Sequence, residues 1–76
     1  MERYRNLNGN SGVVAYATGD DYIDIRFRED GTYRYTYEIP GREDVEEMKR
    51  LAQAGRGLST YISTHVKGRY ASKADD

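Results

Sequence analysis

Hydrophobic and polar residues alternate along three successive stretches of the chain, which is typical of β-strands with one buried face. The clearest stretch is YIDIRFR, residues 22–28, where Ile, Ile and Phe occupy every second position. Residues 13–18 and 32–38 follow the same pattern, and Gly-containing or Asp-containing turns separate the three stretches. We therefore predict three antiparallel strands over these ranges.

The period changes to a helical one after Pro40, which ends the third strand because proline cannot donate to a strand ladder. Residues 41–55, GREDVEEMKRLAQAG, carry acids first and bases later, as the helix dipole favours. Gly55 is a suitable C-terminal cap, and a second, shorter helix over 58–66 is closed by Gly68. The predicted fold is α+β, a three-stranded antiparallel β-meander with two helices packed on one face (βββαα).

The two ends of the chain lack this periodicity. Residues 1–10 are polar and rich in Asn and Gly, so we expect a flexible N-terminal arm, and residues 71–76 are expected to form a flexible tail. The single domain then covers 11–70. No apolar run approaches the ~20 residues that span a bilayer, and no signal segment is recognisable, so we expect a cytoplasmic protein without a membrane partner.

The stretch YRYTY, residues 33–37, places three tyrosines on one face of its strand, and the preceding turn decides which face that is. A two-residue turn at 30–31 would expose the tyrosines, as a platform on which bases could stack. A three-residue turn at 29–31, with a left-handed glycine, sets Phe27 opposite Tyr33 and turns the tyrosines inward. Because each buried side chain contributes about 1.5–3 kcal/mol, we predict the three-residue turn.

The same reasoning at the first hairpin predicts a turn at 19–20, which sets Tyr16 opposite Ile23 and Val14 opposite Ile25. Strand and helix patterns together predict one apolar core. Its members are Val14, Tyr16, Ile23, Ile25, Phe27, Tyr33, Tyr35, Val45, Met48, Leu51, Leu58, Ile62 and Val66.

Charge is balanced overall but unevenly distributed. The 12 basic and 13 acidic residues give a net charge of −1, which by itself predicts no polyanionic partner. The segment 48–73, however, contains no acid, so a basic surface is compatible with the neutral sum. Cations that merely follow a helix C-terminus are the alternative explanation. The candidate nucleic-acid-binding residues of this segment are Arg56, Lys67, Arg69, Tyr70 and Lys73.

A second candidate surface lies on the strand face that turns away from the helices. It contains Arg26, Arg28 and Arg34, and the predicted register sets Arg26 opposite Arg34. Like charges in that position are destabilising. They are tolerated if water solvates them, if Asp24 or Glu38 balances them, or if an anion binds there.

Catalytic and metal-binding signatures are missing. Cysteine is absent and His65 is the single histidine, so we expect no metal site and no cofactor. His65 falls at the edge of the second helix's apolar stripe, where we expect a half-buried packing role. Ser59 and Ser63 lack a nucleophile motif, and we predict that the protein is not an enzyme.

Residues 12–70 resemble the KTSC domain, a small domain named for the C-terminal extension of some lysyl-tRNA synthetases. Three strands with a central Y-x-Y, a proline, a helix, and a second helix ending in G-[RK]-Y are shared in this order. The matching residues are Val14-Ala15-Tyr16, Ile25-Arg26-Phe27, Gly31, Tyr33-Arg34-Tyr35, Ile39-Pro40, Leu51 and Val66-Lys67-Gly68-Arg69-Tyr70. The chain departs from the family between the helices, where Gly55-Arg56-Gly57-Leu58 replaces a Ser-Lys-Gly step.

Two hypotheses of function follow. The resemblance to a synthetase extension implies RNA, either tRNA or single-stranded RNA, as a candidate partner for a small non-enzymatic binding module. The alternative is a protein-interaction or homodimerising module without a nucleic-acid role, whose small core is completed by a partner at exposed strand edges.

Overall fold

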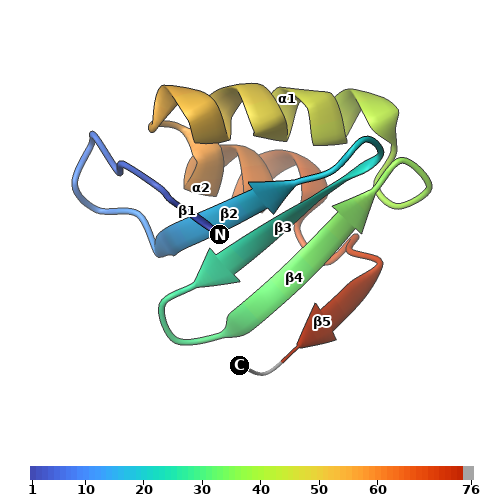
Figure 1. Ribbon diagram of the computed structural model, residues 1–76, viewed down its shortest axis with the longest axis horizontal. Coiled ribbons are helices and arrows are strands. Elements are labelled where there is room, and N and C mark those ends of the chain that lie inside the picture. The colour runs from blue at the N-terminus through green and yellow to red at the C-terminus, as the bar shows by residue number, and fades with distance from the viewer. Residues whose placement is uncertain (75–76) are drawn as a thin grey trace.

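Five antiparallel strands form a single sheet in the computed structural model, which describes residues 1–74 (Figure 1). The strands lie in chain order, each hydrogen-bonded to the next, so the sheet is a meander. The fold class is α+β, as predicted, but the sheet has two strands more than expected. The strands are β1 (Glu2–Arg3), β2 (Val13–Thr18), β3 (Tyr22–Phe27), β4 (Gly31–Thr36) and β5 (Ser72–Ala74).

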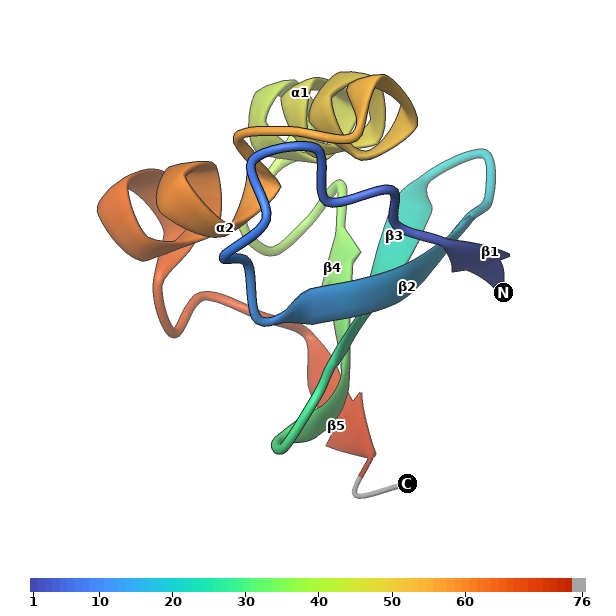
Figure 2. The same cartoon turned by 90° about the vertical axis from the view of Figure 1, so that its left-hand side faces the viewer.

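The helices lie on one side of this sheet (Figure 2). Helix α1 (Arg42–Ala54) ends at Gly55, whose left-handed φ of 80° lets its N–H donate back to the last turn. Helix α2 (Leu58–Tyr61) continues directly into a π-helical turn, η1 (Ile62–Val66). Among residues 1–74 no helix is both long and apolar enough to cross a membrane.

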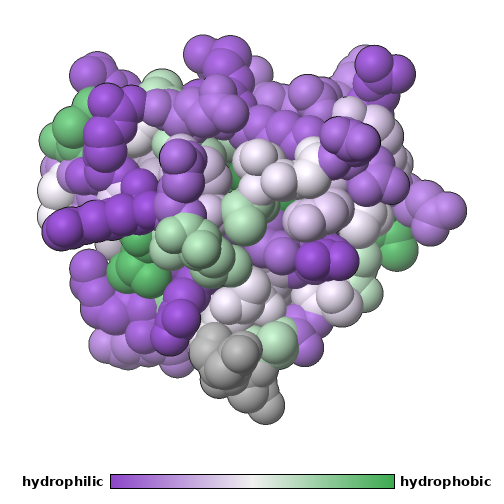
Figure 3. Space-filling model, viewed as in Figure 1, coloured by the Kyte–Doolittle hydropathy of each residue, from purple (hydrophilic) through white to green (hydrophobic). Residues whose placement is uncertain are grey.

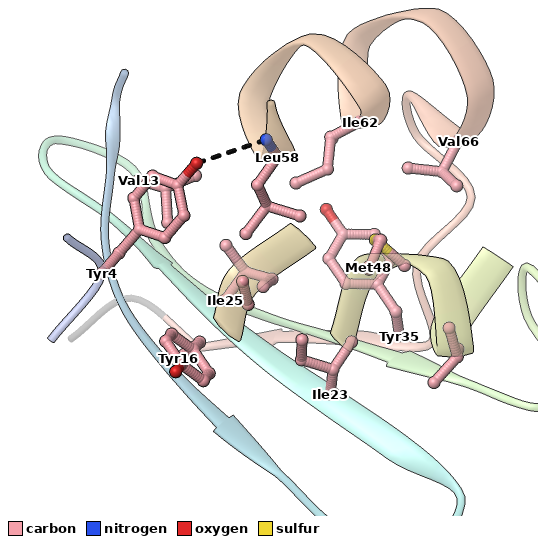
Figure 4. Packing of buried hydrophobic residues seen from close by; sticks show 12 residues of the cluster. Tyr4, Val13, Tyr16, Ile23, Ile25, Tyr35, Met48, Leu58, Ile62 and Val66 are labelled. Atoms are coloured by element: carbon pink, nitrogen blue, oxygen red, sulfur yellow. Dashed lines mark hydrogen bonds between the residues drawn. The ribbon is translucent and has the colours of Figure 1, made fainter. Parts of the chain in front are cut away.

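The core fills the space between the sheet and the helices (Figure 4). Ile23, Ile25 and Tyr35 of the sheet are at most 1% exposed, and Met48 and Leu58 of the helices are fully buried. The tyrosines of β4 therefore face the helices. The remaining fully or partly buried members of this cluster are Tyr4, Val13, Tyr16, Phe27, Tyr33, Tyr37, Val45, Leu51, Ala52, Tyr61, Ile62, Val66 and Tyr70.

The β3–β4 hairpin has the predicted face but a different register. Tyr33 lies opposite Ile25 rather than Phe27, and Phe27 lies opposite Gly31. The shift is two residues, so every side chain stays on its expected face. Gly31 adopts the left-handed φ of 81° that ends the turn.

The β2–β3 hairpin corrects one predicted core residue. Tyr16 pairs with Ile25, and the turn lies one residue later than expected, since the Gly19 N–H donates to the carbonyl of Tyr22 (3.0 Å). A bulge between Val13 and Ala15 then shifts the alternation. Val13 is buried, with 1% exposure, whereas Val14 is only half-buried and lies outside the core cluster.

The N-terminal segment, which we expected to be a flexible arm, packs on the domain. Strand β1 pairs with β2, and Tyr4 is only 3% exposed. The Tyr4 hydroxyl accepts a hydrogen bond from the N–H of Leu58 (3.3 Å), the first residue of α2 (Figure 4). The Leu7 N–H also donates to the carbonyl of Gly55 (2.7 Å). The arm thus closes the gap between the sheet and both helices.

The predicted tail is likewise part of the sheet. Strand β5 pairs with β4, and the Ala71 N–H donates to the carbonyl of Arg34 (2.7 Å). The last part of the expected tail, residues 75–76, lies outside the described residues. The sheet therefore extends beyond both ends of the predicted 11–70 domain.

Removing the Tyr4 ring should destabilise the whole fold. Tyr4→Ala leaves a cavity in the core and should lower the free energy of unfolding by about 3–5 kcal/mol. Tyr4→Phe removes only the hydrogen bond to α2, at about 1 kcal/mol. Urea denaturation measures both. Leu7→Ala, at a position 52% exposed, is the control and should stay within about 0.5 kcal/mol. Wild-type stability in both Tyr4 variants would contradict the packed arm.

Alkaline pH should destabilise the protein through Tyr35. Burial raises the pKa of Tyr35 to about 12, whereas an unfolded tyrosine titrates near about 10. The folded state therefore holds this proton longer, so stability is complete below about pH 10 and falls as the pH rises toward 12. Urea denaturation at several pH values should show a steeper loss in the wild type than in Tyr35→Phe, by up to about 1.4 kcal/mol per pH unit. Parallel curves would contradict this prediction.

Candidate nucleic-acid interface

The predicted basic C-terminal surface is divided and partly neutralised. The Arg69 guanidinium donates to the carbonyl of His65 (2.6 Å) and contacts the Asp44 carboxylate (3.4 Å). Lys73 forms an ion pair with Asp30 (3.3 Å), which raises the pKa of Lys73. These two cations therefore already have acidic partners within the fold.

The other members of that set have different environments. The Tyr70 ring packs edge-on against Tyr33, with 4.7 Å between ring centroids, so it serves the core. Arg56 lies in the connection between α1 and α2, and Lys67 follows the end of η1 with a φ of 43°. Both are exposed and form no ion pair within residues 1–74. Of the five residues, two therefore have acidic partners, one packs on the core, and two are exposed without an ion pair among the described residues.

The sheet face opposite the helices carries a different arginine cluster. We call it the open face, and its members alternate with the core residues of the same strands. Its residues are Arg3, Ala15, Ala17, Tyr22, Asp24, Arg26, Thr32, Arg34, Ser72 and Ala74, with Arg28 continuing the alternation past the end of β3. Figure 3 looks onto this face and shows pale side chains near its middle, bordered by strongly hydrophilic ones.

One cross-strand row of the open face brings two arginines together. Arg3 lies opposite Ala15, and Ala15 lies opposite Arg26, so the two arginines are two strands apart, or about 10 Å between backbones. Arg28 lines a hollow of about 200 Å³ together with Arg3 and Val14. All three arginines are exposed and form no ion pair within the described part of the chain.

Arg34 is positioned differently from the prediction. The two-residue change of register sets it opposite Asp24, while Arg26 lies opposite Thr32, so the expected pair of opposed arginines does not form. Arg34 donates twice to the Asp24 carboxylate, through Nε (2.8 Å) and Nη2 (2.9 Å). These hydrogen bonds raise the pKa of Arg34. Like-charge repulsion therefore gives no argument for a bound anion at this position.

An aromatic ring completes the environment of Arg34. The guanidinium carbon lies 4.0 Å from the centroid of the Tyr22 ring, within the range of a cation–π contact. A Cβ at Gly19 would overlap the Tyr22 ring, so the ring lies directly on the backbone of the hairpin. Only glycine allows this close approach. Tyr22 and Asp24 together fix the orientation of the Arg34 guanidinium.

The single histidine belongs to a surface cluster at the α1–η1 contact. His65 is exposed, not half-buried as expected, and stacks on Tyr61 at 4.2 Å between ring centroids. Burial, and then a hydrogen bond to Asp44 (2.5 Å), raise the pKa of Tyr61 to about 12. Among residues 1–74 no group of three or more His, Asp or Glu side chains is arranged to hold a metal ion.

Sequence reasoning missed Arg3 as a site residue because residues 1–10 were expected to be loose. A signal was present. It was the single aromatic residue Tyr4 between charged residues in the run ERYR, which is too short to give a strand pattern. Arg26 and Arg34 lie on one face as predicted, but the predicted pairing of Arg26 with Arg34 is wrong. Asp24, one of the two acids considered as a balancing charge, pairs with Arg34.

No family model, curated protein or solved structure matches the chain in comparisons with known proteins. The resemblance to the KTSC domain therefore stays a prediction. The candidate interface depends on geometry and charge alone.

The Asp24–Arg34 pair should contribute a measurable coupling energy. A double-mutant cycle with Asp24→Asn and Arg34→Gln should give about 0.5–1 kcal/mol in urea denaturation, because the contact is bidentate and Asp24 is largely shielded from solvent. Salt at about 1 M should reduce the value. A coupling energy of zero would contradict the described contact.

Proposed function

We propose that this chain is a small, non-enzymatic module that binds nucleic acid through the open face of its sheet. The observation that carries the proposal is the position of Arg3, Arg26 and Arg28. They lie exposed at one end of that face and form no ion pair within the described residues. Arg34, Arg69 and Lys73, in contrast, contact acids of the fold.

The chemistry of these side chains supports phosphate as the ligand group. Arginine presents a rigid, planar set of donors that matches the two oxygens of a phosphate. The residues between the arginines are small, since Ala15 separates Arg3 from Arg26. A sugar–phosphate backbone can therefore approach the sheet closely. Counterion release then supplies affinity, although the net charge of the chain is −1.

We propose RNA as the nucleic acid and the KTSC domain as the family, on the resemblance described above. The order of elements supports the family. Strands β2, β3 and β4 are followed by α1 and then by α2 with η1, the arrangement that the resemblance implies. A direct comparison of RNA with DNA of the same sequence tests the preference for RNA.

The dimerising alternative has less support. It needs long exposed strand edges, and β2 and β4 were the expected edges. The middle of each is covered, by β1 with two residues and by β5 with three. Such short edges offer few free backbone groups to another chain.

Neutralising the three arginines should weaken binding of all nucleic acids. The variant Arg3→Gln/Arg26→Gln/Arg28→Gln should lose at least about tenfold in affinity for a fluorescent single-stranded RNA at about 50 mM salt. Its slope of log affinity against log salt should fall by about 2, because about three phosphate contacts are removed. Fluorescence anisotropy at several salt concentrations measures both quantities.

The matched control is Arg56→Gln/Lys67→Gln, which removes exposed charges away from the open face. We expect binding close to wild type in the control. A loss confined to the control would move the interface to the C-terminal residues. Absence of binding to RNA and DNA by the wild type at about 50 mM salt would refute the function, and a concentration-dependent dimer in light scattering would then favour the alternative.

A further inference from the structure

A second hollow lies on the open face beside Arg34. It measures about 200 Å³ and is bordered by residues of three neighbouring strands. Its lining residues are Asp24, Thr32, Arg34, Ser72, Lys73 and Ala74. We infer that this hollow receives one base of a single-stranded nucleic acid, stacked on the guanidinium plane of Arg34. The inference rests on the proposed function and specifies that the bound nucleic acid is single-stranded.

The guanidinium of Arg34 is already held in place for such a contact. Asp24 holds two of its nitrogens at 2.8 and 2.9 Å, and the Tyr22 ring lies 4.0 Å from its central carbon. The side chain nevertheless remains 45% exposed. Arginine planes stack on unpaired bases as aromatic rings do. Because Arg34 does not have to be ordered on binding, little conformational entropy is lost.

The hollow lies next to the phosphate-binding arginines. Thr32, one of its lining residues, is directly opposite Arg26 in the sheet. A phosphate held by Arg26 and a base on Arg34 therefore occupy neighbouring rows of the same face. One nucleotide can satisfy both groups when its base turns toward the sheet.

The residues around the hollow explain the available space and its polarity. Ser72 and Ala74, the small β5 residues that line the hollow, leave the Arg34 side chain 45% exposed within residues 1–74. The Asp24 carboxylate and the Ser72 hydroxyl provide polar groups at the rim. In a duplex the bases are paired and stacked on each other, so none is free to enter. The site should therefore prefer single strands.

Three fluorescent oligonucleotides of equal length test the inference by anisotropy at about 50 mM salt. The first is a single-stranded RNA, the second has the same phosphates but abasic sugars, and the third is a duplex. We expect the single strand to bind the wild type at least about fivefold more tightly than the abasic strand, the lower limit for stacking of one base. The duplex, whose bases are paired, should bind less tightly than the single strand.

Two variants separate the stacking contact from the charge. Arg34→Lys keeps the positive charge but removes the plane, and Tyr22→Leu removes the support beneath it. Both should lose about fivefold or more for the single strand and change little for the abasic strand. Arg50→Lys is the matched control, because Arg50 makes a similar bidentate contact with Glu47 on the helical side. It should bind like the wild type, and thermal melting should show all variants folded.

The outcomes separate this inference from the proposed function. Equal wild-type binding of the single strand, the abasic strand and the duplex would overturn the base site while supporting phosphate binding. Unchanged single-strand affinity in both Arg34→Lys and Tyr22→Leu would overturn it as well. Absence of binding to all three probes would refute the proposed function itself.

Discussion

The register of the β3–β4 hairpin decides which side chains lie on each face of the sheet, and both the core and the open face depend on it. Side chains along a strand alternate between the two faces, so one choice of register turns Tyr33 and Tyr35 toward the helices and Arg34 toward solvent. A shift of one residue would exchange them. The apolar stripe of α1 needs an apolar surface to cover, and burial of the tyrosines outweighs small differences between turns.

Residues 2–3 and 72–74 add the outer strands of this sheet, and the N-terminal segment also contributes to the core. Tyr4 occupies the core, and its hydroxyl accepts the N–H of Leu58, the first residue of α2. A chain of 76 residues has little apolar surface to bury, so each contributed ring matters. The same segment carries Arg3 to the open face. Packing of the N-terminal segment therefore also places Arg3 in the candidate interface.

The open face and the basic C-terminal residues differ in how their charges are paired, rather than in how many charges they carry. Of the basic C-terminal residues, Arg69 contacts Asp44 and a helix carbonyl, and Lys73 contacts Asp30. Asp24 meanwhile holds Arg34 as a flat surface instead of leaving it as a free charge. The open face therefore has two different parts. Exposed arginines lie at one end, and the Arg34 guanidinium, stacked on Tyr22, lies beside a hollow. This arrangement is the basis of the proposed ligand, which has both phosphates and a planar group.

The sequence by itself determined the order and type of the central elements, the α+β class and the inward face of the tyrosines. These features follow from the hydrophobic period, the capping residues and the alternation of side chains along a strand. Each of these is determined by a few neighbouring residues. Only the tertiary structure decided the register, the burial of Val13 in place of Val14, the strands at both ends and the pairing of Arg34 with Asp24. A two-residue shift leaves the hydrophobic pattern unchanged, and short end strands exist only because a neighbouring strand offers its edge. Such features depend on contacts between distant segments, which local pattern does not encode.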